Sequence, residues 1–262
     1  MQKKMGTALT YVHEDGMNYA WVTPQLIVGG CPQTAADIDR LVAEGVGVVL
    51  CLQEDKDMKH FDLDIEPIQG RCSEVGISHL REPISDFDPF DLRKGLARAV
   101  RRLVKEMASQ PGKLAYIHCT AGLGRAPAVA LAYMFWIDGM CLDEAYKQLL
   151  AVRMCHPQIG AIRSATWDLL QDGGCGKQPV RLSIPRGGAA AAEIAGLDVG
   201  WGERLPMVLN ADSDEFVLER ELPIGKLIYK FVVDGDWRVN PELPTITETG
   251  GGNTNNVVVV EP

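Results

Sequence analysis

The sequence has no long apolar run, no excess of positive charge and no closely paired cysteines, and these absences exclude several classes of protein. No stretch approaches the roughly 20 apolar residues that a membrane-spanning helix needs. The longest, residues 126–137, is too short and predicts a buried helix. The formal net charge is −9, whereas affinity for nucleic acid depends on clustered Lys and Arg. We therefore expect no membrane and no nucleic-acid partner.

The seven cysteines include no C-x-x-C pair, and their odd number argues against a disulfide framework. A zinc site is equally unexpected, so we predict neither a metal nor a cofactor. Free thiols favour a reducing compartment. The first residues lead into no apolar signal core and no long Arg- and Ser-rich stretch. A cytosolic chain and the mature form of a targeted chain both fit this start.

Strand-like and helix-like patterns alternate up to about residue 173. Continuous apolar runs at 46–52 and 114–117 predict buried parallel strands. Apolar residues at helical spacing across 92–107 predict an amphipathic helix. We expect a further strand at 26–28 and further helices at 35–44, 126–136, 142–150 and 159–170. The alternation predicts an α/β domain with a central, mostly parallel sheet flanked by helices.

The pattern becomes all-β after Gly176. Segments 180–184, 216–220, 226–233 and 257–260 alternate or are β-branched, and Asp234-Gly235 is a hairpin signal. Short strands separated by turns predict a small β-sandwich. Because the run at 173–178 resembles a linker, we predict one domain at residues 1–174 and a second at 175–262.

The segment His-Cys-Thr-Ala-Gly-Leu-Gly-Arg, from His118 to Arg125, lies between a predicted buried strand and a predicted helix. Its glycines allow backbone N–H groups to turn inward and form a nest for an anion. The helix that follows adds its N-terminal dipole, and Arg125 can bind two phosphate oxygens at once. This positive potential favours a thiolate at Cys119. The predicted phosphate loop comprises Thr120, Ala121, Gly122, Leu123 and Gly124.

A buried cysteine before a glycine-rich turn is the plainer interpretation of this segment, but the flanking strand and helix favour catalysis. The loop resembles the signature of protein tyrosine and dual-specificity phosphatases. That resemblance implies that Cys119 attacks phosphorus to form a phosphocysteine, which water hydrolyses, while Arg125 holds the equatorial oxygens. Many such enzymes have Ser or Thr after the arginine. Here the residue is Ala126, so the second step needs other help.

A general acid must protonate the leaving alkoxide, and three aspartates precede the loop, namely Asp86, Asp88 and Asp91. A solvated loop capping the next helix is the plainer reading, and Asp91 fits it as the N-cap. The family resemblance favours Asp86, which is followed by Phe87. Asp88 is the alternative, and spacing does not decide between them.

A closer resemblance, to plant glucan phosphatases of the starch-excess type, covers about residues 8–262. In the first domain it is carried by residues 16–19, 26–29, 51–53, 87–93, 119–128, 132–136 and 160–163. In the second it is carried by residues 196–204, 229–237 and 253–256, which resemble the glycogen- and starch-binding modules of family 48. The resemblance implies a phosphatase domain followed by a starch-binding module.

The resemblance also implies two sets of glucan contacts. In the module, two tryptophans would stack on glucose rings and two polar residues would bind hydroxyls; these are Trp201, Trp237, Lys230 and Asn256. Near the active site, the matching positions are His60, Phe61, Phe87 and His156. Two of these are His where Tyr or Phe would be expected, which makes the platform smaller. Core packing for the tryptophans and an ordinary surface position for the histidines are the plainer alternatives.

Cys51 closes the buried strand expected to lie beside the active-site strand. A small core residue is the plainer interpretation. The sharper hypothesis is a regulatory disulfide with Cys119, because a thiolate oxidises readily.

We therefore expect a glucan phosphatase that acts on phosphomonoesters of starch-like glucan such as amylopectin, with its two modules packed on each other. A phosphoprotein phosphatase, for which the loop alone would suffice, and a non-catalytic starch-binding scaffold are the alternatives. The resemblance implies the chloroplast stroma at starch granules, with the cytoplasm as the alternative. The sequence leaves open whether phosphate at C6 or at C3 of glucose is preferred.

Overall fold

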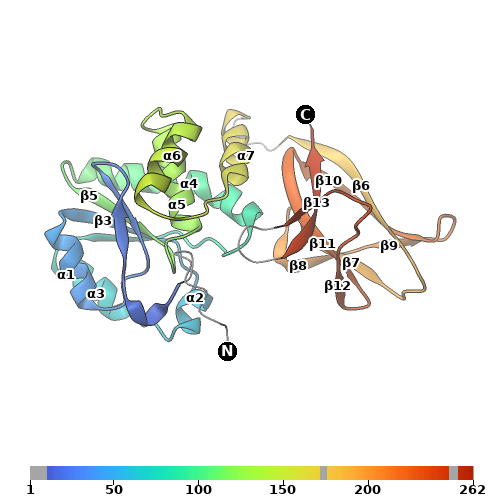
Figure 1. Cartoon of the computed structure of the whole chain (residues 1–262), viewed down its shortest axis with the longest axis horizontal. Coiled ribbons are helices and arrows are strands. Elements are labelled where there is room, and N and C mark those ends of the chain that lie inside the picture. Colours follow the sequence, from blue (N-terminus) through green and yellow to red (C-terminus); the bar gives the residue numbers. More distant parts are fainter. Residues whose placement is uncertain (1–10, 172–175, 248–252, 262) are drawn as a thin grey trace. The chain divides into compact units, whose positions relative to one another are not determined.

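The computed structural model describes residues 11–171, 176–247 and 253–261 (Figure 1). The chain divides into two compact units. The first contains the residues up to Asp86 and Lys94–Ile159, and the second contains Phe87–Arg93 and the residues from Gly160 onward. The predicted boundary between residues 174 and 175, with Cys175, lies outside the described residues. No helix in the described ranges is long and apolar enough to cross a membrane.

The first unit is built on a five-stranded sheet with the order β1-β2-β5-β3-β4. The strands are β1 (Tyr19–Trp21), β2 (Leu26–Gly29), β3 (Val46–Cys51), β4 (Ser78–Arg81) and β5 (Leu114–His118). All neighbours are parallel except β1, which pairs antiparallel to β2. The mostly parallel sheet predicted from the apolar runs is confirmed. Its parallel strands all end at one edge, where α/β proteins usually place their chemistry.

Helices cover both faces of this sheet. On one face, α1 (Ala35–Ala43) and α3 (Glu66–Glu74) share an apolar cluster with Ile27, Val49 and Tyr116 of the strands. Because strand side chains alternate, Ala115 and Ile117 point to the other face. There α5 (Arg125–Trp136) packs on β2 and β5 and against α6 (Leu142–Val152). The remaining helices of this unit are η1 (His13–Asp15), α2 (Asp55–His60) and most of α4 (Pro89–Ser109).

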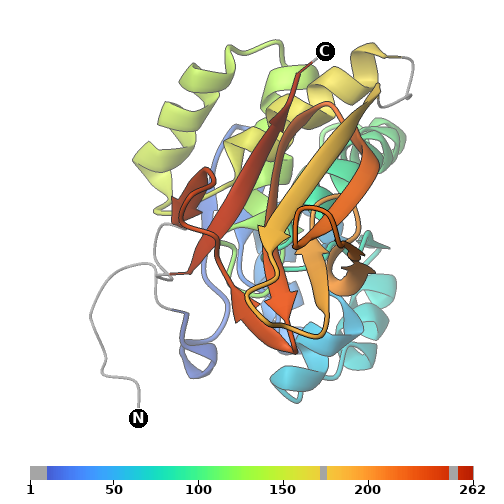
Figure 2. The same ribbon diagram turned by 90° about the vertical axis from the view of Figure 1, so that its right-hand side faces the viewer.

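The second unit contains two antiparallel sheets, whose strands face the viewer in Figure 2. One sheet joins β6 (Lys177–Pro185), β10 (Glu215–Pro223) and β9 (Val208–Asn210). The other has the order β13-β14-β11-β7-β8, with β12 paired to β11. Its strands are β7 (Ala192–Gly196), β8 (Gly200–Pro206), β11 (Gly225–Val233), β12 (Asp236–Arg238), β13 (Thr245–Thr247) and β14 (Thr254–Val260).

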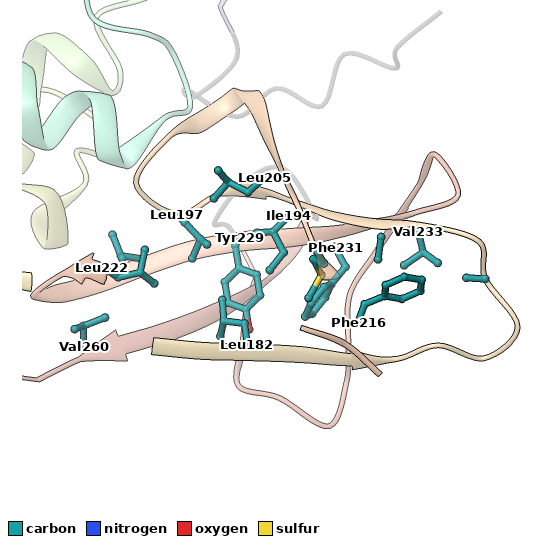
Figure 3. Close-up of a cluster of buried hydrophobic side chains, with 14 residues drawn as sticks. Leu182, Ile194, Leu197, Leu205, Phe216, Leu222, Tyr229, Phe231, Val233 and Val260 are labelled. Carbon is teal, nitrogen blue, oxygen red and sulfur yellow. The ribbon is translucent and has the colours of Figure 1, made fainter. Parts of the chain in front are cut away.

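A single apolar cluster draws its residues from both sheets (Figure 3). Leu182 and Phe216 come from the three-stranded sheet, and Ile194, Tyr229 and Phe231 come from the larger one. Their side chains fill the space between the sheets, so the predicted all-β sandwich is confirmed.

The second unit also includes all of α7 (Ile159–Leu170) except its first residue, and the start of α4. There Arg93 donates through Nε and Nη2 to the two carboxylate oxygens of Asp168, at 2.6 and 2.5 Å. This bidentate pair joins the two helical segments within the unit.

Candidate active site

The predicted phosphate loop lies at the carboxyl edge of the parallel sheet. β5 ends at His118 and α5 begins at Arg125, so the loop is held between a central strand and a helix N-terminus. Cys119 follows the strand directly and is 3% exposed. The sequence pattern predicted this arrangement, and it places the thiol where the helix dipole and the loop amides favour an anion.

The loop carbonyls are hydrogen-bonded on the outside. Thr120 O accepts from Cys31 N at 2.9 Å, and Leu123 O accepts from His156 N at 2.8 Å. The two carbonyls between them, of Ala121 and Gly122, accept from Arg153 at 3.1 and 2.7 Å. Gly124 O accepts from Ala128 N at 3.1 Å, within helix α5. In a peptide unit the C=O and the N–H point in opposite directions. Because the carbonyls of residues 120–123 bond to other segments, the N–H groups of the same peptide units face the opposite side, which is the arrangement of an anion nest.

Gly122 is required by the path of the loop. Its φ is +67°, a region that residues with a side chain rarely adopt. A Cβ atom at this position would also lie 2.3 Å from the carbonyl oxygen of Gly29. The glycine that the sequence supplied is therefore the residue type that lets the loop pack against the end of β2.

Arg125 is 3% exposed and is bound by acceptors on both sides of its guanidinium. Nη1 donates to Asp57 Oδ2 at 2.6 Å and to Ile84 O at 2.9 Å, and Nη2 donates to Asp86 Oδ2 at 3.0 Å. Burial opposes its charge, but the charges of Cys119, Asp86 and Asp57 outweigh burial and raise the pKa of Arg125. The side chain is thus a fixed cation, oriented for an anion in the loop. Asp57 was not predicted, because nothing in its local sequence distinguishes it from a helix-capping residue.

The structure separates the three candidate acids. Asp86 lies on Arg125, as described above. Asp88 is 9% exposed, and its Oδ1 accepts from the backbone N of Phe90 at 3.0 Å and of Asp91 at 2.9 Å. Asp88 is therefore the N-cap of α4, the role that the sequence suggested for Asp91. Of the three, only Asp86 is shown with its carboxylate on the loop arginine.

Cys51 lies at the end of β3, directly opposite His118 in the neighbouring strand β5. It is fully buried, and burial raises the pKa of its thiol to about 11. Burial also lowers the pKa of His118 to about 3, so this ring stays neutral beside the loop. The sequence correctly placed Cys51 beside the active-site strand.

An aromatic cluster forms around Phe61. His13 stacks on its ring at a centroid distance of 4.7 Å, and Tyr11 and His60 contact it edge-on at 5.5 and 4.7 Å. The Tyr11 hydroxyl also lies 3.5 Å from Sγ of Cys31, whose backbone N bonds the phosphate loop. The structure thus unites the predicted His60 and Phe61 with two residues that the sequence analysis missed, since Tyr11 and His13 lie in a short irregular segment without a periodic pattern.

The other two predicted contacts near the loop are exposed. His156 bonds the loop through its backbone N, and its side chain is solvent-exposed. Phe87 is 67% exposed with a φ of +58°. It belongs to the second unit, where its carbonyl oxygen accepts from Nε1 of Trp201 at 3.1 Å.

The outer face of the larger sheet of the sandwich carries the two predicted tryptophans. Trp237 is 48% exposed, and its ring centroid lies 6.4 Å from that of Trp201. Trp237 pairs with Val232 across β12 and β11, so strand alternation places Lys230 on the same face. The guanidinium carbon of Arg204 lies 5.2 Å from the Trp237 ring centroid and steadies the indole through a cation–π contact.

The structure contradicts a direct sugar contact by Asn256. This residue pairs with Tyr229 on the core side of the sheet and is fully buried. Its Oδ1 accepts from Asn240 N at 2.9 Å and its Nδ2 donates to Asn240 O at 2.7 Å, so the amide fastens the 240–244 segment instead. Alternation along β14 puts its neighbour Asn255 on the Lys230 face. Counting back from the core residues Val258 and Val260 could have found this.

The fold and the site define a class, namely a cysteine-dependent phosphatase domain joined to a β-sandwich with an exposed tryptophan face. Residues 17–157 match the family model described as "Swiss Army Knife protein, DSP-PTPase phosphatase domain". Residues 178–262 match the model described as "Glycogen recognition site of AMP-activated protein kinase". Among solved structures, that of kinase associated phosphatase is similar to this chain with a TM-score of 0.48 and a sequence identity of 15%. The match covers 60% of this chain and 96% of that chain.

Two curated relatives match nearly the whole chain. "Phosphoglucan phosphatase DSP4, amyloplastic" of Castanea sativa is 43% identical over 99% of this chain and 69% of its own length. "Phosphoglucan phosphatase LSF1, chloroplastic" of Arabidopsis thaliana is 32% identical over 96% of this chain and 43% of its own length. The chain therefore belongs to the family of DSP-type phosphatases that includes phosphoglucan phosphatase DSP4.

Proposed function

We propose that this protein is a glucan phosphatase that hydrolyses phosphomonoesters on starch-like glucan such as amylopectin. The observation that carries the proposal is the presence, in one chain, of the Cys119–Arg125 loop and the Trp201–Trp237 face. A loop of this kind suffices for phosphate esters in general. A sugar-stacking face has no evident use on a phosphopeptide.

In the proposed mechanism, the Cys119 thiolate attacks phosphorus while the loop amides and Arg125 hold the nonbridging oxygens. Asp86 protonates the leaving alkoxide of the glucan, and as a carboxylate it then activates the water that hydrolyses the phosphocysteine. The Asp86 carboxylate already lies on Arg125, 3.0 Å from Nη2, which supports this assignment. Ala126 offers no hydroxyl to help the thiolate leave, so the loop amides carry that stabilisation.

The glucan is held in two places. Near the loop, the cluster of Tyr11, His13, His60 and Phe61 offers ring faces to a sugar chain. On the sandwich, Trp201, Trp237 and Lys230 tether the polymer, which raises the effective concentration of phosphoryl groups at the loop. Phe87 and His156 are exposed and remain proposed contacts. The assay described below measures whether phosphate at C6 or at C3 of glucose is released preferentially.

We also propose that the phosphatase domain and the sandwich pack on each other. Residues 87–93 follow the acid Asp86 in the sequence and share a compact unit with the sandwich, which supports this. The relatives' names, amyloplastic and chloroplastic, favour a plastid, with starch granules as the site of action.

A redox control of the same nucleophile is proposed for Cys51. Hydrogen peroxide would oxidise the Cys119 thiolate to a sulfenic acid with release of hydroxide. Attack by the Cys51 sulfur on this group would then form the disulfide and release water. The position of Cys51 opposite His118, one residue before Cys119, supports the pairing.

The test is release of phosphate from phosphorylated amylopectin, with the position of the phosphate resolved. Release by the wild type and its loss in Cys119→Ser are expected. Equal or faster turnover of phosphotyrosine peptides would favour the phosphoprotein phosphatase instead. Binding of amylopectin without any hydrolysis, of glucan or of p-nitrophenyl phosphate, would favour a non-catalytic scaffold.

A further inference from the structure

A second arginine lies behind the phosphate loop, on the side away from the inward-facing amides. Arg153 follows α6 and is 9% exposed. Its Nε donates to Gly122 O at 2.7 Å, and its Nη2 donates to Ala121 O at 3.1 Å and to Asn18 Oδ1 at 2.8 Å. One guanidinium therefore binds two consecutive carbonyls of the loop and one side-chain amide.

All of these acceptors are neutral. Among the described residues no carboxylate pairs with Arg153, so a full positive charge is buried without a counterion. This is costly, since burial disfavours an unpaired charge. Burial lowers the pKa of Arg153, while the charge of Cys119 is among the influences that oppose the shift. Cys119, one of the groups that oppose this shift, is the proposed nucleophile of the loop.

The other buried arginines of the described residues are arranged differently, because each of them pairs with a carboxylate. Arg125 contacts Asp57 and Asp86, and Arg93 contacts Asp168. A carboxylate beside Arg153 would satisfy the same hydrogen bonds but would cancel the positive potential behind the loop. An amide at position 18 binds the guanidinium and leaves its charge unbalanced.

We propose that Arg153 is a positioning residue for phosphoryl transfer, which fixes the loop amides toward the anion and supplies an uncompensated positive charge from behind the loop. It does not touch the substrate. Through the carbonyls of Ala121 and Gly122 it orients the peptide groups that bind the phosphoryl oxygens, and its charge stabilises both the thiolate and the bound phosphate. The inference rests on the proposed phosphatase activity, but not on the glucan as substrate.

The decisive variant is Asn18→Asp. Aspartate is isosteric with asparagine and still accepts the bond from Nη2, so the brace stays intact, while its carboxylate neutralises the Arg153 charge. Arg153→Gln removes the charge and most of the donors, and Arg153→Lys keeps the charge but loses the two-carbonyl contact. Arg71→Gln is the matched control, because Arg71 is a surface arginine of the same unit that pairs with Asp39 and Glu74.

The measurements are the inhibition constant of inorganic phosphate, kcat and KM on p-nitrophenyl phosphate, and the thermal unfolding midpoint. For Asn18→Asp we expect phosphate inhibition about tenfold weaker, from the loss of one nearby charge, with an unfolding midpoint at or above that of the wild type, because the buried Arg153 charge gains a partner. Arg153→Gln should lose at least as much, Arg153→Lys should lie between it and the wild type, and Arg71→Gln should match the wild type.

Wild-type phosphate inhibition and kinetics in Asn18→Asp would overturn the proposal and leave Arg153 as a structural brace, even if Arg153→Gln unfolds. If Cys119→Ser still hydrolysed p-nitrophenyl phosphate, the proposed phosphatase site itself would be wrong. If p-nitrophenyl phosphate were hydrolysed but amylopectin were not, only the glucan assignment would fail, and the Arg153 inference would stand or fall on the Asn18→Asp result.

Discussion

Nη2 of Arg125 donates a hydrogen bond to Oδ2 of Asp86 across 3.0 Å, so the proposed acid and the phosphate-binding cation are already in contact. We expect Asp86 to lie beside the leaving oxygen of a bound phosphate ester, because it contacts the arginine that is proposed to bind the other oxygens of the same group. Asp57 holds the opposite side of the guanidinium at 2.6 Å. When a phosphate oxygen accepts the hydrogen bond from Nη2, Asp57 can keep Arg125 in place while Asp86 turns to the ester oxygen.

The first prediction distinguishes Asp86 from Asp88. Asp86→Asn should lower kcat on phosphoglucan by about 10²–10⁴-fold, the range for loss of a general acid. It should lower kcat on p-nitrophenyl phosphate much less, because that leaving group needs no proton. Asp88→Ala should keep kcat and lose about 1 kcal/mol of stability, because it removes the N-cap of α4. Equal losses of kcat in the two variants would reject the assignment.

The second prediction concerns the tryptophan face. Trp237→Ala should weaken amylopectin binding about tenfold, as expected for an exposed aromatic anchor, and leave hydrolysis of p-nitrophenyl phosphate unchanged. Val208→Ala, at an apolar position that is 73% exposed on the other sheet, is the control. Asn256→Ala should instead lower the unfolding midpoint of the protein, because it removes buried hydrogen bonds worth about 1–3 kcal/mol. A parallel loss of glucan binding and aryl phosphatase activity in Trp237→Ala would indicate misfolding.

The third prediction concerns oxidation. Wild-type protein treated with hydrogen peroxide should lose activity and regain most of it with dithiothreitol, because a disulfide with Cys51 stops oxidation at a reversible stage. Cys51→Ser should lose activity irreversibly. Cys31→Ser is the control, because Cys31 is another buried thiol whose backbone contacts the loop. Full recovery in Cys51→Ser with irreversible loss in Cys31→Ser would assign the resolving thiol to Cys31.

The fourth prediction is a loss of stability on mild acidification. His79 lies on β4, and both of its ring nitrogens are buried without a hydrogen-bond partner among the described residues. Burial, followed by the charge of Arg81, lowers its pKa to about 4. Between the unfolded pKa of about 6.5 and this value, the unfolded state binds a proton that the folded state does not. The free energy of unfolding should therefore fall as the pH falls, by at most about 1.4 kcal/mol per unit for this group.

Urea unfolding of the wild type and of His79→Leu at pH 7, 6 and 5 checks this prediction. The wild type should lose stability more steeply than the variant. A residual slope in His79→Leu is expected from His118, whose pKa burial lowers to about 3 in the same direction. Identical slopes for the two proteins would show that His79 is solvated in the folded state.

The main helices and the buried strands could be predicted from local patterns. The apolar run at 46–52 became β3, the spacing across 92–107 became part of α4, and the β-branched run at 257–260 became the end of β14. Several other short elements were missed. β4, with the sequence Ser-His-Leu-Arg, is polar at three of four positions and is a strand only because β3 pairs with it. β8 and β13 likewise show no strong period and are fixed by their neighbours.

The proposed catalytic loop could be predicted because the residues expected to carry out its chemistry are close together in the sequence. Cys119, the glycines and Arg125 are brought together by the turn between one strand and one helix, which is a local property. Residues that serve the loop from a distance were not predictable. Asp57 and Arg153 reach it only through the packing of α2 and of the segment after α6, and no motif marks either of them.

The sequence by itself determined the order of an α/β domain and a β-sandwich, and it predicted the proposed nucleophile, its arginine and the short list of candidate acids. Tertiary structure separated the members of that list, because only the folded chain shows that the Asp88 carboxylate caps a helix and that the Asp86 carboxylate contacts Arg125. It also decided the direction of Asn256, since pairing with β11 sets which of two neighbouring asparagines faces the core. These features depend on hydrogen bonds between segments that are distant in the sequence, and a local sequence pattern does not reveal such bonds.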